Sequence, residues 1–123
     1  MAKTVKLTTD NKISVVDIQW DLDGWEKAID AGCTESVKTQ LMLDFFGEMV
    51  VMIVDESGFD KGLPENPVAS FFYGCGCPIV GNVIFGVMDG PNIKPPEDAG
   101  SLLQTLKHTF SFLKEEKEIE AIM

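Results

Sequence analysis

The amino-acid sequence predicts a small α+β domain in which a largely antiparallel β-sheet packs against two main helices. A chain of 123 residues, 45% of them hydrophobic and 24% charged, is long enough and apolar enough to bury one core. Short β-branched runs alternate with turn-forming residues, and two longer segments carry apolar residues at helical spacing. The expected order, in a single domain spanning residues 1–123, is strand, strand, helix, strand, strand, short helix, strand, helix.

The first elements are expected to be the two strands of a β-hairpin. Thr4–Leu7 and Ile13–Ile18 are short runs of β-type residues. Between them lies the Asp10-Asn11 pair, and both residue types tolerate the backbone conformations of tight turns. The chain should therefore reverse direction at this pair.

A first helix is predicted within residues 19–32. Three apolar side chains recur there at helical spacing, namely Trp25, Ala28 and Ile29. Asp21 or Asp23 would cap the N-terminus, because a carboxylate oxygen can accept a hydrogen bond from a free N–H group of the first turn. Gly32 would end the helix.

Two further strands are predicted next. Ser36–Phe46 alternates hydrophobic and polar residues, which is the period of a strand with one wetter face, although a helix stays open as the alternative. Gly47 and Glu48 form a tight turn. Met49–Val54 reads MVVMIV, the most hydrophobic run in the chain, and its short length and β-branched content indicate a buried central strand.

The segment after this strand combines a turn with a helix start. Asp55–Gly58 predicts a turn in which the glycine can adopt a positive φ. Asn66 is expected as an N-cap, with Pro67 at the first helical position, where its missing N–H costs nothing. Val68–Tyr73 should then form a short helix that ends at Gly74.

The last third of the chain is expected to form a strand, a loop and a helix. Pro78–Met88 is the strand, and residues 89–100 have the composition of a loop. The strand is interrupted at two glycines that permit a bulge or a close neighbour, Gly81 and Gly86. Ser101–Ile119 carries an apolar stripe typical of an amphipathic helix, with Lys114–Met123 as its charged helical tail.

The charge balance argues against one class of function. Twenty acidic residues face ten basic residues, all of them lysine, for a net charge of −10. Binding to DNA or RNA draws most of its affinity from basic groups, and arginine is the side chain best matched to phosphate. We therefore expect no direct nucleic-acid binding. An acidic surface suits a basic protein partner, or serves solubility alone.

The same composition predicts a cytoplasmic protein without membrane contact. No apolar run reaches the length of a membrane span, and the N-terminus lacks the apolar core of a signal peptide. Three cysteines, an odd number, are expected as reduced thiols: Cys33, Cys75 and Cys77. A long terminal helix and free strand edges also allow a two-fold homodimer.

No complete catalytic set is visible, so we expect neither enzymatic activity nor a cofactor. Asp55, Glu56 and Asp60 cluster after the central strand, where a solvated turn is the preferred interpretation and a small hydrolase using these acids is the alternative. His108, the one histidine, should face solvent. It could complete a zinc site with the three cysteines, but a single residue separates Cys75 from Cys77, closer than structural zinc sites usually allow.

A resemblance rests on the middle of the chain. The pattern DExG, GLPxNxxA and IxGxxxxxG appears in this order, carried by Asp55, Glu56, Gly58, Gly62, Leu63, Pro64, Asn66, Ala69, Ile79, Gly81 and Gly86. With both flanks, this covers the larger part of the chain and resembles a family of small phage and mobile-element proteins that share a domain of unknown function. The resemblance implies work inside a bacterial host cell. It implies no catalytic residues.

Small acidic proteins of such elements often neutralise components of host defence. The expected function is therefore that of a non-enzymatic accessory protein that binds a host or defence protein through its acidic surface, with a sponge for a nucleotide immune signal as the alternative. Not all aromatics of the FFYG sequence can face inward from a short helix, so one is expected to be presented to a base, a ligand or a partner protein. The expected contact residues are Asp55, Glu56, Gly62, Leu63, Pro64, Asn66, Phe72 and Tyr73.

Overall fold

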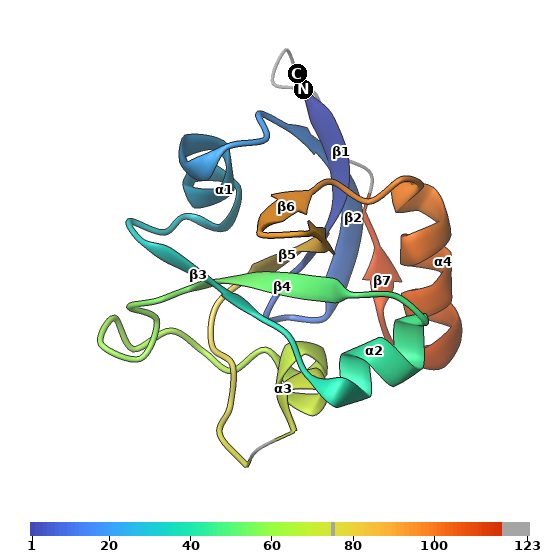
Figure 1. Ribbon diagram of the computed structural model, residues 1–123. Coiled ribbons are helices and arrows are strands. Elements are labelled where there is room, and N and C mark those ends of the chain that lie inside the picture. Colours follow the sequence, from blue (N-terminus) through green and yellow to red (C-terminus); the bar gives the residue numbers. More distant parts are fainter. Residues whose placement is uncertain (75, 117–123) are drawn as a thin grey trace.

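The computed structural model describes residues 1–74 and 76–116 and has one β-sheet with helices on both faces (Figure 1). The strands follow the order β3-β4-β5-β1-β2-β7, with β6 paired to β5. The strands are β1 Ala2–Leu7, β2 Lys12–Ile18, β3 Thr34–Val37, β4 Val50–Asp55, β5 Val83–Asp89, β6 Asn92–Lys94 and β7 Lys114–Glu115. The helices are α1 Leu22–Ile29, α2 Gln40–Phe46, α3 Pro67–Tyr73 and α4 Ala99–Thr109. The predicted α+β fold with a largely antiparallel sheet is confirmed, because only β2 and β7 pair in parallel.

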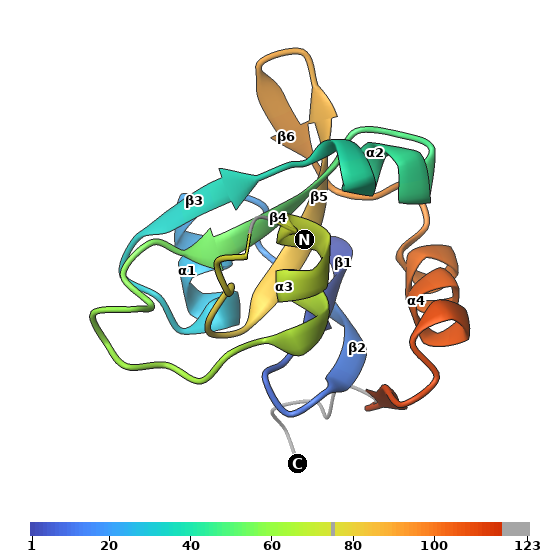
Figure 2. The same ribbon diagram turned by 90° about the horizontal axis from the view of Figure 1, so that it is seen from below.

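The two faces of the sheet bury two separate hydrophobic cores. Successive strand residues point to opposite faces, so Met52 joins the core under α2, α3 and α4, whereas Ile53 joins the core under α1. Figure 1 shows α1 on the opposite side of the molecule from α2 and α4. In Figure 2, seen from below, α3 lies in front of the sheet. The larger core therefore has three helices as its cover.

The predicted hairpin is confirmed and the first helix is confirmed with one correction. β1 and β2 pair from Ala2–Ile18 to Leu7–Ile13 around a turn in which Asn11 has a φ of 64°. Asp21 is the N-cap of α1, and its carboxylate accepts from Gly24 N at 2.9 Å. The predicted stop at Gly32 is wrong. The helix ends two residues earlier, at Asp30, because this aspartate adopts the left-handed conformation that closes a helix.

The predicted strand Ser36–Phe46 is mostly wrong: only Ser36 and Val37 belong to β3, and Gln40–Phe46 form α2, the helix that the sequence pattern allowed as the alternative. Thr39 caps the helix by accepting from Met42 N at 3.2 Å, and Gly47 ends it with a φ of 75°. The side chains that reach the core are Met42, Phe45 and Phe46, which lie at the spacing of one helical face. The alternation along Leu41 and Leu43 resembled a strand by coincidence.

β4 and α3 match their predictions closely. Every residue of β4 is buried, and the strand lies between β3 and β5, so it is an interior strand as expected. Asn66 is the N-cap of α3, Pro67 occupies the first turn and Gly74 closes the helix with a φ of 73°. Local capping chemistry therefore determined both ends of this short helix.

The segment after α3 contains a strand that the sequence did not predict. β5 begins at Val83 rather than at Pro78, and the preceding residues make an isolated bridge between Glu65 and Val80. The predicted loop at residues 89–100 contains β6, which folds back on β5. Gly86 permits this approach, because a Cβ atom there would lie 2.5 Å from Ile93 Cγ2.

The last predicted helix is too long. α4 spans Ala99–Thr109, and Lys114–Glu115 forms β7 instead of a helical tail. This segment pairs with the free edge of β2. Lys114 N donates to Asn11 O at 3.0 Å, and Glu116 N donates to Ile13 O at 2.8 Å. The edge strand β2 has unpaired backbone N–H and C=O groups. An extended segment can pair with these groups, whereas the backbone groups of a helical turn are hydrogen-bonded within the helix. The rest of the predicted tail lies outside the described residues.

Candidate functional site

The predicted contact region, Asp55–Tyr73, begins with a carboxylate that is tied down inside the molecule. Asp55 ends β4, and its side chain has no exposed surface. It accepts hydrogen bonds from Lys61 Nζ at 2.6 Å and from Ser57 N at 2.9 Å. Lys61 Nζ also donates to Asp30 O at 3.2 Å, at the C-terminal end of α1. The Asp55–Lys61 pair therefore fixes the loop to the end of β4 and to the end of α1.

The other residues of this loop do not converge on a reaction centre. Glu56 and Asp60 are exposed, whereas Asp55, the third acid of the hydrolase alternative, is buried and paired. Within residues 1–74 and 76–116, no group of three or more histidine, cysteine or acidic residues could hold a metal ion. The remaining predicted contacts form the return of the loop: Gly62 with a φ of 69°, Leu63 half-buried against Gly81, and exposed Pro64.

Asn66 holds three parts of the chain together. It has no exposed surface. Its Nδ2 donates to Leu7 O at 3.1 Å and to Gly81 O at 3.0 Å, while its Oδ1 accepts from Ala69 N at 3.3 Å. Both donors and the acceptor are thus used inside the protein, at the end of β1, before β5 and at the start of α3. The Asn66 side chain therefore stabilises the fold and has no free group for a partner protein.

The aromatic residues of α3 divide between core and surface. Phe72 has no exposed surface and Tyr73 is half-buried, whereas Phe71 is 52% exposed. Phe71 is therefore the aromatic that α3 presents. The sequence predicts one presented aromatic, but the expected contacts at Phe72 and Tyr73 do not match Phe71, because the face that a helix turns to the sheet depends on tertiary packing.

Phe71 belongs to a patch with two residues that follow α4. Its ring centroid lies 5.5 Å from that of Phe110, which in turn lies 6.1 Å from that of Phe112. Phe112 is 55% exposed and Phe110 is half-buried. We call Phe71, Phe110 and Phe112 the aromatic patch. It joins α3 to the segment after α4, two regions that are far apart in the sequence.

The residues considered for zinc do not form a site in the described part of the chain. Cys33 and Cys77 are exposed free thiols, and His108 is exposed on α4. Cys75 lies outside the described residues. The expectation of a solvent-facing histidine is confirmed.

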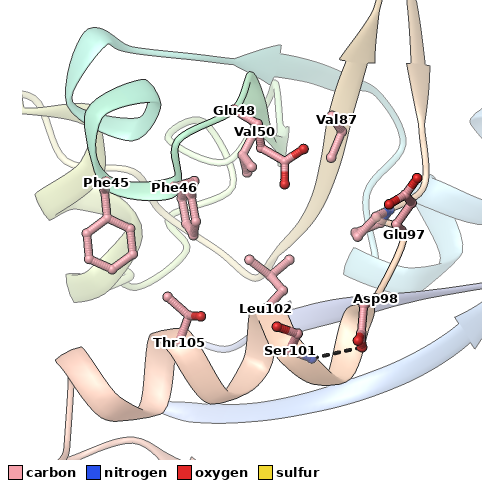
Figure 3. Close-up of a pocket in the computed structure, with 11 residues that line it drawn as sticks. Phe45, Phe46, Glu48, Val50, Val87, Glu97, Asp98, Ser101, Leu102 and Thr105 are labelled. Carbon is pink, nitrogen blue, oxygen red and sulfur yellow. Dashed lines mark hydrogen bonds between the residues drawn. The ribbon is translucent and has the colours of Figure 1, made fainter.

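A pocket that the sequence did not predict lies between α2, the β4–β5 region and the N-terminus of α4 (Figure 3). Its volume is about 250 Å³. Phe46, Val50, Val87 and Leu102 contribute apolar side chains to it. The remaining lining residues are Phe45, Glu48, Pro96, Glu97, Asp98, Ser101 and Thr105. We call this cavity the α2–α4 pocket.

Carboxylates stand on two walls of the α2–α4 pocket. Figure 3 shows Glu48 beside Val50 and above Leu102, across from Glu97 and Asp98. Asp98 is the N-cap of α4, and one of its oxygens accepts from Ser101 N at 3.0 Å. All three acids are exposed, and none forms an ion pair with a described residue. The pocket therefore combines an apolar interior with a negative rim.

The clearest shifts of carboxyl pKa lie away from this pocket. A hydrogen bond from the Thr8 hydroxyl is the main cause that lowers the pKa of Asp10 in the hairpin turn. The backbone N–H of Gly24 is the main cause that lowers the pKa of Asp21 at the start of α1. Both carboxylates stabilise local structure.

Comparison with protein-family models, with curated proteins and with solved structures gave no match. The resemblance to small phage and mobile-element proteins therefore stays a prediction. Among the described helices, none combines the length and the apolar character needed to cross a bilayer.

Proposed function

We propose that this protein is a non-enzymatic accessory protein of a phage or mobile element that binds a protein component of its bacterial host or of host defence. The observation that carries the proposal is the aromatic patch on a chain of net charge −10. Phe71 and Phe112 each expose more than half of their surface. Large aromatic side chains are enriched among the residues that dominate binding energy at protein interfaces.

The geometry of the patch favours a partner of protein size. Phe110 lies between the two exposed rings, and its ring centroid is also 5.6 Å from that of the buried Phe72. The exposed rings are thus anchored on the core, which reduces the entropy lost when a partner covers them. The excess of acidic residues provides long-range attraction for a basic partner.

A nucleotide sponge has less support. It needs donors for phosphate. Of the three candidate lysines, Lys61 pairs with Asp55 at 2.6 Å and Lys107 pairs with Glu115 at 2.9 Å, which leaves exposed Lys94 without an ion pair to a described residue. No described lysine lines the α2–α4 pocket, and its carboxylates would repel phosphate. The hydrolase alternative has less support as well, since Asp55 is buried and paired with Lys61, whereas Glu56 and Asp60 are exposed.

A comparison of matched phenylalanine variants tests the proposal. Tagged wild-type protein would be used to capture partners from a bacterial lysate, and the captured protein would then be purified and its affinity measured by calorimetry. The Phe71→Ser/Phe112→Ser double variant should weaken that affinity by at least about tenfold, which corresponds to ~1.4 kcal/mol. Phe59→Ser is the control, because Phe59 is 66% exposed but lies in the 55–66 loop.

Equal affinity of the double variant and the wild type would remove the aromatic patch as the contact surface. A loss confined to Phe59→Ser would move the contact to the loop. Calorimetry against a panel of cyclic nucleotides completes the test, because saturable nucleotide binding without any protein partner would favour the sponge.

A further inference from the structure

We infer that the α2–α4 pocket binds a lysine side chain of the protein partner. The inference rests on the proposed function only in taking the partner to be a protein. The site itself is separate, because no residue of the aromatic patch lines this pocket.

The interior of the pocket fits the methylene stem of lysine. Val50 and Val87 are buried strand residues, and Phe46 and Leu102 bring apolar surface from α2 and α4 (Figure 3). A lysine side chain buries its methylene groups along such surfaces while its ammonium head stays at the polar edge. A volume of about 250 Å³ leaves room for an unbranched side chain.

The rim fits the ammonium head. Glu48 comes from the turn before β4, whereas Glu97 and Asp98 come from the segment before α4, so negative charge flanks the opening on both sides. Neighbouring carboxylates beside an apolar surface make the local electrostatic potential more negative, and a bound cation neutralises part of it. No described lysine lines the pocket to supply that cation from within the chain.

Two other occupants fit less well. A metal ion needs several oxygen ligands at coordination distance, and the described acids form no group that could hold one. An arginine head is a planar fork that is best met by a carboxylate in the same plane, whereas acids on separate walls suit the compact, three-donor ammonium group. The shape and the charge together therefore favour lysine.

The experiment is an NMR titration of backbone amides with N-acetyl-lysine N-methylamide. Matched titrations use the norleucine analogue, which has a similar chain without the charge, and the arginine analogue. We expect saturable shifts at Val50, Ser101 and Leu102 with the lysine compound, and weaker binding of both matched compounds. The Phe71→Ser/Phe112→Ser variant should give the same shifts as the wild type.

Variants of equal net charge isolate the rim. Glu48→Gln/Glu97→Gln should weaken lysine binding by about threefold to tenfold, as expected for the loss of two partly exposed charge contacts. Glu35→Gln/Glu56→Gln removes two exposed glutamates elsewhere and should leave the affinity unchanged. Equal weakening by both pairs, equal binding of norleucine, tighter binding of arginine, or shifts away from the pocket would each overturn the assignment.

The two proposals fail separately. Loss of lysine-analogue binding with an intact effect of the aromatic patch on partner capture would overturn only the pocket. Lysine binding at the pocket with unchanged capture by the Phe71→Ser/Phe112→Ser variant would overturn only the patch.

Discussion

The Asp55–Tyr73 segment and the α2–α4 pocket both carry acidic and aromatic residues, but they use them in opposite ways. In the segment, Asp55 is paired with Lys61 and Asn66 is hydrogen-bonded to three parts of the chain. In the pocket, Glu48 and Glu97 have no ion pair with a described residue. The segment that looked functional in the sequence is largely scaffold, whereas an inconspicuous turn and loop supply the acidic rim of the pocket.

This difference shows that the role of a polar side chain depends more on its hydrogen bonds and ion pairs within the protein than on its residue type. A buried polar group whose hydrogen bonds are all made within the protein has nothing to offer a ligand, and its removal costs stability. A solvated carboxylate beside apolar surface contributes little to stability and remains available for a cation. Substitutions in the two regions should therefore separate stability from binding.

The largest expected contrast lies within α3 itself. Phe72→Ala should lower the free energy of unfolding by about 3–5 kcal/mol, because it leaves a cavity in the larger core. Phe71→Ala, one residue earlier, should cost less than about 1 kcal/mol, since more than half of its side chain is already exposed. Urea unfolding followed by circular dichroism measures both. Similar losses for the two variants would contradict the division of α3 into core and surface.

Asn66→Ala should produce the next largest effect. It removes the cap of α3 and leaves the Leu7 and Gly81 carbonyls without one of their donors, which together should cost about 2–4 kcal/mol. Asn92→Ala is the matched control at an exposed position and should change stability by less than about 0.5 kcal/mol. A stable Asn66→Ala protein that has lost partner binding would instead make Asn66 a contact residue.

Charge removal compares the two regions directly. Lys61→Met should cost about 1–2 kcal/mol, because it leaves the buried Asp55 carboxylate without its ammonium partner. Glu48→Gln/Glu97→Gln should change stability by less than about 0.5 kcal/mol, because these carboxylates are exposed and have no ammonium partner among the described residues. Unfolding at low and at high salt measures both. A large loss in the glutamate pair would mean that the rim of the pocket is scaffold as well.

The smallest expected effect concerns pH at α1. The pKa of Asp21 is lowered in the folded protein, chiefly by the Gly24 N–H, so its contribution to stability is present above its ordinary pKa of 3.8 and is lost as the pH falls through the lower, folded value. Asp21→Asn keeps a cap but removes this titration, and should flatten the acid side of the stability curve. Asp23→Asn, which changes the charge equally without touching the cap, should leave the slope unchanged. Equal slopes in all three proteins would contradict the role of Asp21.

Several parts of the molecule follow from local chemistry, and these were predicted. The hairpin follows from the Asp10-Asn11 turn, β4 follows from its uninterrupted hydrophobic run, and α3 follows from Asn66, Pro67 and Gly74. In each case the residues that set the conformation lie within or directly beside the element that they specify. Short-range hydrogen bonds and backbone preferences are therefore sufficient.

The candidate sites were beyond such reasoning. The aromatic patch needs Phe71 and Phe112 to come together across 41 positions of sequence, and the α2–α4 pocket needs Glu48 to stand opposite Glu97. The sequence did predict that one aromatic of α3 would be presented, but not which one. A spacing pattern specifies the face of a helix, whereas the direction of that face depends on what the helix packs against.

The amino-acid sequence alone was enough to establish the α+β class, the interior position of β4 and the acidic character of the surface, because composition, hydrophobic runs and capping residues act locally. Only the folded structure decided that residues 40–46 are helical and that Lys114–Glu115 extends the sheet beside β2. It also decided that the polar groups of Asp55 and Asn66 are bonded to other groups within the protein. These outcomes depend on contacts between distant segments, where burial and the pairing of backbone groups outweigh the local pattern.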